Sequence, residues 1–233
     1  RQQLTRLPLD DLEAHMDGLR YFKAAHVLRV AASELVGRLP LMQVSDKLTW
    51  IAEVILEHVL AVAWADLTRR YGQPQRDGSG SGFAVFGYGK MGGIELGYGS
   101  DLDLVFIYDA ASAGATDGDR SVDNAVFYTR LGQRMIHIFE TRMAMGALYE
   151  VDMRLRPSGE SGLLAGTVQA FRTYQFNSAW TWEHQALVRA RFVAGDPQVG
   201  AEVDALRRDI LCEPRDQKAL AREVVTMRDK MRK

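Results

Sequence analysis

Two aspartates that lie two residues apart, Asp101 and Asp103, begin an apolar run and directly follow a glycine-rich stretch, residues 87–99. Side chains alternate along a strand, so both carboxylates project to one face while Leu102 and Leu104 point to the other. Backbone amides exposed in a glycine-rich turn suit the binding of an anion. Paired carboxylates beside such a turn are typical of a site for a divalent cation and a phosphate.

A third acidic position comes from residues 147–156, where apolar and polar residues alternate as in a half-buried strand. The polar face of this strand carries two acids and two bases: Glu150, Asp152, Arg154 and Arg156. We expect Asp152 to be the third metal ligand, with Glu150 as the alternative on the same face. Arg154 and Arg156 are candidates for contacts with phosphate, although exposed bases beside acids often only balance charge.

Three such carboxylates suit the binding of two Mg²⁺ ions that bridge the phosphates of a nucleoside triphosphate. Magnesium prefers hard oxygen ligands and completes its shell with substrate phosphates and water. Bound metal would lower the pKa of an attacking hydroxyl and neutralise charge on leaving pyrophosphate. The candidate nucleotide contacts in the turn and just after it are Gly89, Lys90, Gly92 and Ser100.

Composition limits the partners and the compartment. A formal net charge of -1 over 233 residues gives no global attraction to nucleic acid or to an anionic membrane, so we expect neither as a partner. The single cysteine, Cys212, excludes an internal disulfide and fits a reducing, cytoplasmic location. We expect no run near the roughly 20 apolar residues of a membrane span and no signal peptide. Because the chain starts at Arg1, we expect a fragment of a longer protein.

Residues 1–72 have a helical pattern. The second helix in this region is predicted from about residue 45 to 71, with Ser45 or Asp46 as its N-cap. Residues 73–82 are rich in Gly and Ser and are predicted to be a linker. Residues 83–165 then form the predicted catalytic core. Its elements are strands at 83–86 and 102–108, a mobile loop at 110–123, a helix at 124–143 ended by Gly146, and the strand at 147–156.

Residues 166–233 are predicted to form a helical C-terminal region. Thr167 caps its first helix, residues 180–191 form another, and Asp196 with Pro197 begins a third that runs to about Leu211. Pro214 precedes a last, charged helix. Together these elements predict an α+β fold: a small mixed sheet flanked by helices, with the acids at one edge.

Three blocks of this sequence resemble the nucleotidyltransferase module of bacterial glutamine synthetase adenylyltransferase, a family of the DNA polymerase beta-like superfamily. The blocks are residues 87–106 (GYGKMGGIELGYGSDLDLVF), 148–159 (LYEVDMRLRPSG) and 180–191 (WTWEHQALVRAR). They occur in the order of the family, and the resemblance covers nearly the whole chain. It implies a polymerase beta-like fold with Asp101, Asp103 and Asp152 as the metal ligands.

The resemblance also implies a reaction. Members of this family carry one module that adds AMP to a tyrosine of glutamine synthetase and a related module that removes it, and the wording of the three blocks is closer to the adding module. ATP would then donate AMP and release pyrophosphate, with PII signalling protein and glutamine as regulators of the full-length enzyme. One departure is that the superfamily usually has a Gly-Ser pair upstream of its acids, whereas this turn has Gly89-Lys90.

Three alternatives compete with this interpretation. The first is the AMP-removing module of the same family, since both modules share the acids. The second is a Rossmann oxidoreductase, because Gly87, Gly89 and Gly92 match the dinucleotide fingerprint with Asp109 as the ribose acid; however, residues 93–100 are too few and too glycine-rich for a crossover helix. The third is an interaction module with an inert site.

Several aromatic, acidic and histidine residues are expected to have structural rather than catalytic roles. Trp180, Trp182 and Phe192 are expected in the core rather than as a base-stacking platform. Glu183 and His184 are expected to be structural, as are four further histidines without metal-ligand spacing: His15, His26, His58 and His137.

Overall fold

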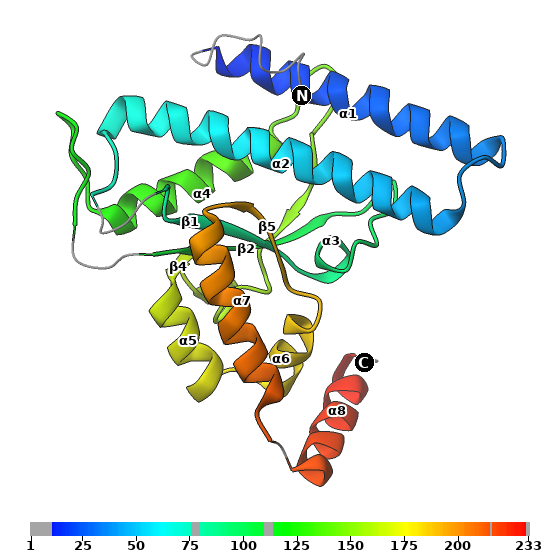
Figure 1. Cartoon of the computed structure of the whole chain (residues 1–233), viewed down its shortest axis with the longest axis vertical. Helices are drawn as coiled ribbons and strands as arrows, with labels where there is room; N and C mark the ends of the chain where they lie inside the picture. Colours follow the sequence, from blue (N-terminus) through cyan, green and yellow to red (C-terminus); the bar gives the residue numbers. More distant parts are fainter. Residues whose placement is uncertain (1–10, 76–79, 110–113, 215, 232–233) are drawn as a thin grey trace.

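The computed structural model describes residues 11–75, 80–109, 114–214 and 216–231, and they form a mixed α+β molecule (Figure 1). A sheet lies in the middle, with long helices on one side of it and shorter helices on the other. The α+β class predicted from the sequence is therefore confirmed.

Five strands form one mixed sheet, and β2 pairs with three of the other four. β1 (Phe83–Gly87) is antiparallel to both β2 (Leu102–Tyr108) and β5 (Arg191–Gly195). Two short strands share the other edge of β2: β3 (Val151–Asp152) pairs in parallel with its first residues and β4 (Ala165–Thr167) with its last. The start of β2 and all of β3 therefore meet at one corner of the sheet.

Three helices cover one face of the sheet: α1 (Leu12–Leu35), α2 (Leu41–Tyr71) and α4 (Asn124–Glu140) (Figure 1). Their apolar side chains form one continuous core with the strand residues that face them. The apolar stripe predicted for α4 is buried, as expected from its helical spacing: Phe127, Leu131, Met135, Ile138 and Phe139.

Helix α2 is the central helix of this layer. By length and composition alone it could cross a membrane, contrary to the expectation from the sequence. Its apolar side chains Leu48, Ile55 and Val59 are buried within the core that it shares with α1, α4 and the sheet. The core helix of a soluble protein passes the same test of length and composition.

The opposite face of the sheet is covered by α5 (Val168–Asn177) and α7 (Pro197–Cys212), with α6 (Thr181–Leu187) beside them (Figure 1). A second, smaller core fills this side and includes Phe86 and Val105 from the strands. The last helix, α8 (Gln217–Met231), packs against α6, and in Figure 1 it extends away from the sheet.

Both predicted caps of this second layer are confirmed. The Thr167 hydroxyl accepts a hydrogen bond from the Ala170 amide, at 3.0 Å, at the start of α5. Asp196 accepts from the amide of Gln198, at 2.9 Å, at the start of α7. The other carboxylate oxygen of Asp196 accepts from the Gly82 amide, which ties the entry of β1 to α7.

Two predicted helix boundaries were wrong. Helix α2 begins at Leu41 after Pro40, so Ser45 and Asp46 lie inside it rather than capping it. Pro40 is the N-cap residue, with extended backbone angles and no side-chain hydrogen bond to the first turn. Helix α4 ends at Glu140, and Gly146, with φ of 83°, belongs to a separate turn closed by Met143.

The strand at 147–156 was predicted too long, because only β3 forms ladder bonds there. The helix predicted at 180–191 was wrong at its end: α6 stops at Leu187 and Arg191 starts β5. The sequence of this strand lacks the alternation of polar and apolar residues that would distinguish it from the helix just before it. Trp180 is 68% exposed and Trp182 lies at the surface beside it, so the prediction that they belong to the core was also wrong.

The loop at 110–123 has no helix or strand in its described part, residues 114–123. Thr116 there is buried and forms an isolated bridge with Pro74, which joins this loop to the end of α2. Residues 76–79 of the predicted linker and 110–113 of the predicted loop lie outside the described residues.

Candidate active site

The corner of the sheet brings together the three aspartates named from the sequence. Asp103 on β2 and Asp152 on β3 are direct partners in the parallel ladder, and Asp101 lies just before β2. One carboxylate oxygen from each of the three lies within 4.8 Å of the others, and all three side chains are partly buried. Carboxylates this close can share a divalent cation.

Gly89 makes room for Asp103. A Cβ at position 89 would lie 2.3 Å from Oδ2 of Asp103, and the φ of +49° is in the left-handed region that favours glycine. The next-door amide of Tyr88 donates to the Asp103 carbonyl at 2.9 Å, so the turn is fixed to the strand. The turn therefore contacts Asp103 directly.

The three acids differ electrostatically. Burial raises the pKa of Asp103, and the charges of Asp101 and Asp152 raise it further, against the opposing charges of Lys90 and Arg154. Asp152 is the opposite case, because hydrogen bonds from Arg154 lower its pKa. A bound cation would therefore favour the charged form of Asp103, whose pKa is raised.

The basic residues predicted beside the acids are divided between two roles. Arg154 forms an ion pair with Asp152 at 2.5 Å, and its side chain is 72% exposed, so it can turn toward a ligand. Arg156 instead donates to three loop carbonyls, those of Met153, Glu160 and Gly162. Lys90 is exposed in the turn, close enough to affect the pKa of Asp103. Arg156 therefore holds the loop after β3, whereas Lys90 and Arg154 have exposed charges.

A groove of about 440 Å³ opens over the corner. Its lining is mostly polar and contains two of the three acids with both arginines: Asp101, Glu150, Val151, Asp152, Met153, Arg154, Arg156 and Glu160. Glu150, the alternative ligand, is exposed on this groove and lies outside the close cluster formed by the three aspartates. Of the two acids weighed as the third ligand, the geometry thus favours Asp152 on β3 over Glu150 just before it.

Ser100 and Gly92 stabilise the turn. The Ser100 hydroxyl accepts from the Gly97 amide at 3.0 Å, just ahead of Asp101. Gly92 donates its amide to the Tyr88 carbonyl, and a Cβ there would lie 1.7 Å from the Arg189 carbonyl oxygen. Gly92 is therefore required for close packing of the turn against the chain that enters β5.

Arg191 is a site-supporting residue that the sequence analysis missed. Its guanidinium donates to the carbonyls of Met91 and Gly92 and forms an ion pair with Glu53 of α2. It fixes the back of the glycine turn from β5. Because residues 180–191 had a helical pattern, no sequence signal placed Arg191 on a strand beside this turn.

A family model described as "Glutamate-ammonia ligase adenylyltransferase" matches residues 1–206. The chain belongs to this adenylyltransferase family. Two relatives, from Pseudomonas putida and Hahella chejuensis, are 59% and 58% identical over 235 and 234 residues. Each is named "Bifunctional glutamine synthetase adenylyltransferase/adenylyl-removing enzyme". The alignments cover 100% and 99% of this chain but 24% of each relative, so the chain spans about a quarter of their length.

The donor set of this adenylyltransferase family member fits a magnesium ion. All three close groups are carboxylates, which are hard oxygen ligands, and the groove leaves space for phosphates and water to complete an octahedral shell. Burial, and then the charges of Asp101 and Asp152, raise the pKa of Asp103, and a cation at the cluster would offset that repulsion.

The fold excludes the Rossmann alternative. A dinucleotide-binding unit needs two parallel strands joined by a crossover helix, but β1 and β2 are antiparallel. The helix between them, α3 (Gly89–Gly92), has 4 residues. The glycine pattern of the turn therefore serves close contacts with Asp103 and with the chain that enters β5.

Glu183 and His184 have structural contacts, as expected. Glu183 accepts from the Tyr174 hydroxyl and from the Trp180 amide, and His184 Nε2 lies 2.9 Å from the Gln175 carbonyl oxygen. Both residues tie α6 to α5.

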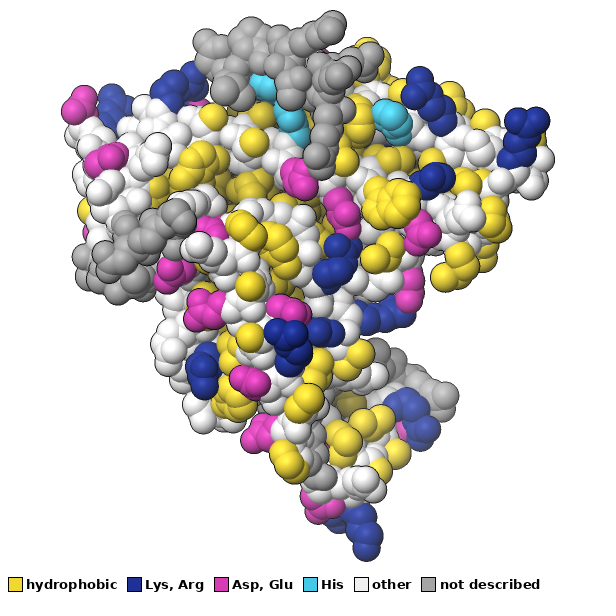
Figure 2. Space-filling model, in the orientation of Figure 1, with side chains coloured by type: hydrophobic (Ala, Val, Ile, Leu, Met, Phe, Trp, Pro, Cys, Tyr) yellow, Lys and Arg dark blue, Asp and Glu magenta, His cyan; other side chains and the backbone are white. Residues whose placement is uncertain are grey.

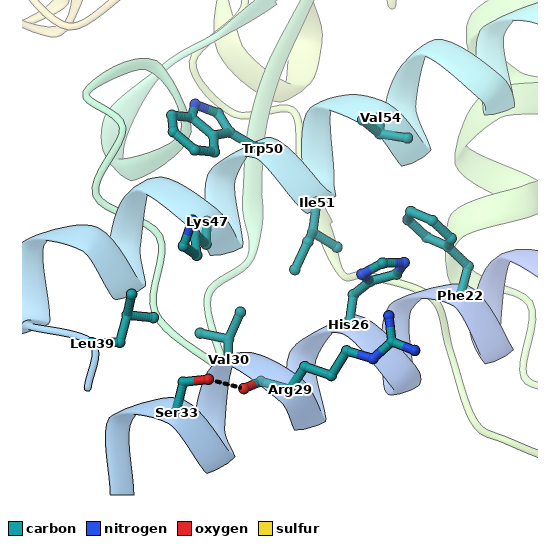
Figure 3. Close-up of a pocket in the computed structure, with 10 residues that line it drawn as sticks. All are labelled: Phe22, His26, Arg29, Val30, Ser33, Leu39, Lys47, Trp50, Ile51 and Val54. Atoms are coloured by element: carbon teal, nitrogen blue, oxygen red, sulfur yellow. Dashed lines mark hydrogen bonds between the residues drawn. The ribbon is translucent and has the colours of Figure 1, made fainter. Parts of the chain in front are cut away.

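A separate hollow of about 380 Å³ lies between α1 and α2 (Figure 3). Figure 3 shows apolar side chains such as Phe22, Ile51 and Trp50 around it, with Arg29 and Lys47 as its charged residues. None of its 10 lining residues is acidic, so this hollow offers no cation site comparable to the aspartate corner.

Proposed function

We propose that this chain is the AMP-adding module of its family, which transfers AMP from ATP to a tyrosine of glutamine synthetase and releases pyrophosphate. The observation that carries the proposal is the triad Asp101, Asp103 and Asp152 placed against the turn at Gly89. Three carboxylates clustered at one corner of the sheet can hold the cation that assists an in-line displacement at a phosphate.

In the reaction, the tyrosine oxygen forms a bond to the α-phosphorus of ATP, and the bond from that phosphorus to the oxygen bridging the α- and β-phosphates breaks. The tyrosine proton leaves to solvent or to a base, and the electron pair of the broken bond leaves with pyrophosphate. Mg²⁺ at the triad supplies charge neutralisation for the departing phosphates.

The residues of the chain then have distinct tasks. Asp101, Asp103 and Asp152 hold the cation, and Arg154 can exchange its ion pair with Asp152 for a bond to a phosphate oxygen. Lys90 adds positive charge at the glycine turn, where the superfamily has a hydroxyl. We propose these five side chains as the reacting surface, with Gly89 and Gly92 shaping the turn.

Removal of AMP is a second candidate, because the names of both relatives include an adenylyl-removing activity. Removal by phosphate would use the same acids, with phosphate in place of pyrophosphate. By resemblance to the adding module we place addition first. A cytoplasmic location, and regulation of the full-length enzyme by PII protein and glutamine, remain part of the same proposal.

The test is transfer of label from α-³²P-ATP to purified glutamine synthetase with Mg²⁺, comparing wild type with Asp103→Asn. The control is Asp204→Asn, which changes a half-exposed carboxylate on α7. Asp204 forms ion pairs with Arg207 and Arg208 of the same helix. We expect label on the substrate with wild type and the control and a loss of at least about a hundredfold with Asp103→Asn.

Two other outcomes separate the alternatives. A wild-type chain that transfers no label but releases ADP from adenylylated glutamine synthetase and phosphate would be the removing module. A chain inactive in both directions that still binds glutamine synthetase would be an interaction module, and the proposal would be wrong.

A further inference from the structure

A second cavity adjoins the acid groove, on the face of the sheet that α5 covers. It has a volume of about 400 Å³ and lies between the end of β2, strand β4, helix α5 and the loop at 157–163. Arg156 lines both this cavity and the groove over the aspartates. Arg156 therefore lies at the border between the two hollows.

The direction of β2 relates the two sites. Asp103 and Ile107 are four residues apart, so their side chains project from the same face of the strand, about 13 Å apart at roughly 3.3 Å per residue. Asp103 is in the acid cluster and Ile107 lines the cavity. An extended nucleotide with its phosphates at the acids can span this separation.

We propose that the cavity binds the nucleobase of the nucleoside triphosphate whose phosphates lie at the aspartates; the inference rests on the function proposed above. The walls are apolar and aromatic, with Ile107 from the sheet and Phe171 and Tyr174 from α5. Flat π-faces and aliphatic groups are the surfaces on which a base stacks. The hydroxyls of Ser158 and Ser161, on the loop, can bond the polar edge of the base.

The loop over the cavity is held in a defined shape. Arg156 donates to the carbonyls of Glu160 and Gly162, and the Ser161 hydroxyl donates to the Ser158 carbonyl at 2.8 Å. Ser158 itself has φ of +63°, a left-handed conformation that costs free energy in a residue other than glycine. Such strained residues cluster where a backbone clamps a ligand.

Gly166 gives a way to fill the cavity without disturbing its walls. It pairs with Ile107 in the parallel ladder, so a side chain at 166 would project to the same face as Ile107. A Cβ built there meets no atom within 4 Å, and the backbone is not left-handed. The valine side chain of Gly166→Val therefore occupies the space assigned to the base. Valine also favours strands, so we expect β4 to be retained.

The experiment measures the binding of Mg²⁺-ATP and of Mg²⁺-tripolyphosphate by isothermal titration calorimetry. The variants are Gly166→Val and Ala170→Leu, which fill the cavity from opposite walls, and the matched control is Gln169→Leu, which adds a leucine on α5 outside the lining. We expect both filled variants to lose roughly tenfold to a hundredfold in ATP affinity, the amount a stacked base contributes. Tripolyphosphate binding should be unchanged, and Gln169→Leu should match wild type.

The result that overturns the inference is ATP affinity equal to wild type in both filled variants, with unfolding temperatures that show both to be folded. Wild type that binds ATP no more tightly than tripolyphosphate also overturns it, because the base then adds no affinity. Wild type that binds neither ligand contradicts the proposed function itself, and the inference falls with it. Since tripolyphosphate lacks a base, these failures are distinguishable.

Discussion

At the scale of single residues, the site depends on the absence of a side chain as much as on the acids. Gly89 has a left-handed backbone, and its missing Cβ is the space that Oδ2 of Asp103 occupies. A methyl group there would displace the carboxylate whose pKa is raised by burial and by the charges of Asp101 and Asp152.

We therefore expect Gly89→Ala to lower Mg²⁺-dependent nucleotide binding by at least about tenfold. The matched control is Gly146→Ala, which imposes the same left-handed strain where a Cβ meets open space. Both variants should lose about 1 kcal/mol of stability, the cost of a left-handed alanine, but only Gly89→Ala should lose binding. Calorimetry and urea denaturation measure the two effects, and equal binding losses would contradict the role assigned to Gly89.

The pKa of Asp103 gives a prediction on pH. A carboxylate must be deprotonated to bind a cation, and a raised pKa means that protonation begins at a higher pH than for an ordinary aspartate. On acidification we expect Mg²⁺ affinity to fall first through Asp103. The Asp103 carboxyl can be titrated by NMR in metal-free protein, and Asp101→Asn should lower its pKa by removing one neighbouring charge. A titration unchanged by Asp101→Asn would show that the charge of Asp101 does not contribute to the raised pKa of Asp103.

At the scale of elements, the glycine turn is supported by the chain that enters β5. Two arginines two residues apart contact it in different ways. Arg191 is partly buried and bonds two turn carbonyls together with Glu53, whereas Arg189 is half-exposed and pairs with the exposed Glu95. The two positions form a natural comparison.

Arg191→Lys should destabilise the fold by about 1–3 kcal/mol, because a lysine cannot satisfy two carbonyls and a carboxylate together and leaves partly buried groups unpaired. Arg189→Lys should cost less than about 1 kcal/mol, as is usual for an exposed pair. Urea denaturation of both variants checks this. Similar losses in the two variants would mean that Arg191 does not hold the turn.

The contact of α1 with α2 includes two histidines, with His15 Nδ1 3.0 Å from His58 Nε2. Burial, and then the neighbouring His15, lower the pKa of His58 to about 4. The unfolded chain, with a histidine pKa near 6.5, then binds more protons than the folded chain between pH 6.5 and 4, so this contribution to stability is lost as the pH falls through that window.

Between pH 7 and 5 we expect the wild type to lose roughly 1 kcal/mol more stability than His58→Gln, a figure reduced from the full shift because His58 is only partly buried. Urea denaturation of both proteins at the two pH values measures the difference. Parallel losses would show that His58 does not contribute to the acid sensitivity.

At the scale of the whole molecule, the two helical layers differ in how firmly they are joined to the sheet. Helices α1 and α2 share one core with the strands, while α8 packs against α6 at the outer side of the second layer. Exposed apolar side chains also lie at the junction of α1 and α2: Leu35, Val36, Leu41 and Met42. Figure 2 shows hydrophobic atoms, in yellow, at that end of the molecule.

Truncation after Glu213, which removes α8, should change the unfolding temperature by no more than about 4 °C, corresponding to a loss of roughly 1 kcal/mol or less. The groove between α6 and α8 contains Trp180 and Trp182, so their fluorescence should shift to longer wavelength in the shortened chain. Loss of cooperative unfolding would show instead that α8 is part of the core.

The features predicted from the sequence depend on residues close together in the chain, whereas the missed features depend on pairing between segments far apart in the chain. The acids, the glycine turn and the caps Thr167 and Asp196 follow from residue types at short spacing, and the structure has each of them. Strand β5 was missed because its apolar run joins a helical pattern without a break. The bonds of Arg156 to loop carbonyls were not predicted, because they depend on a loop shape that no residue spacing encodes.

The pairing of the strands also sets the order in which the three carboxylates come together during folding. Asp101 and Asp103 come from the contiguous β1–turn–β2 unit, whereas Asp152 joins through a parallel pairing with a segment far along the chain. Local contacts form early in folding and distant pairings late, because closing a long loop costs entropy first. A cation that needs all three carboxylates then binds only after the slow step. Mg²⁺ should therefore slow unfolding while leaving the refolding rate unchanged.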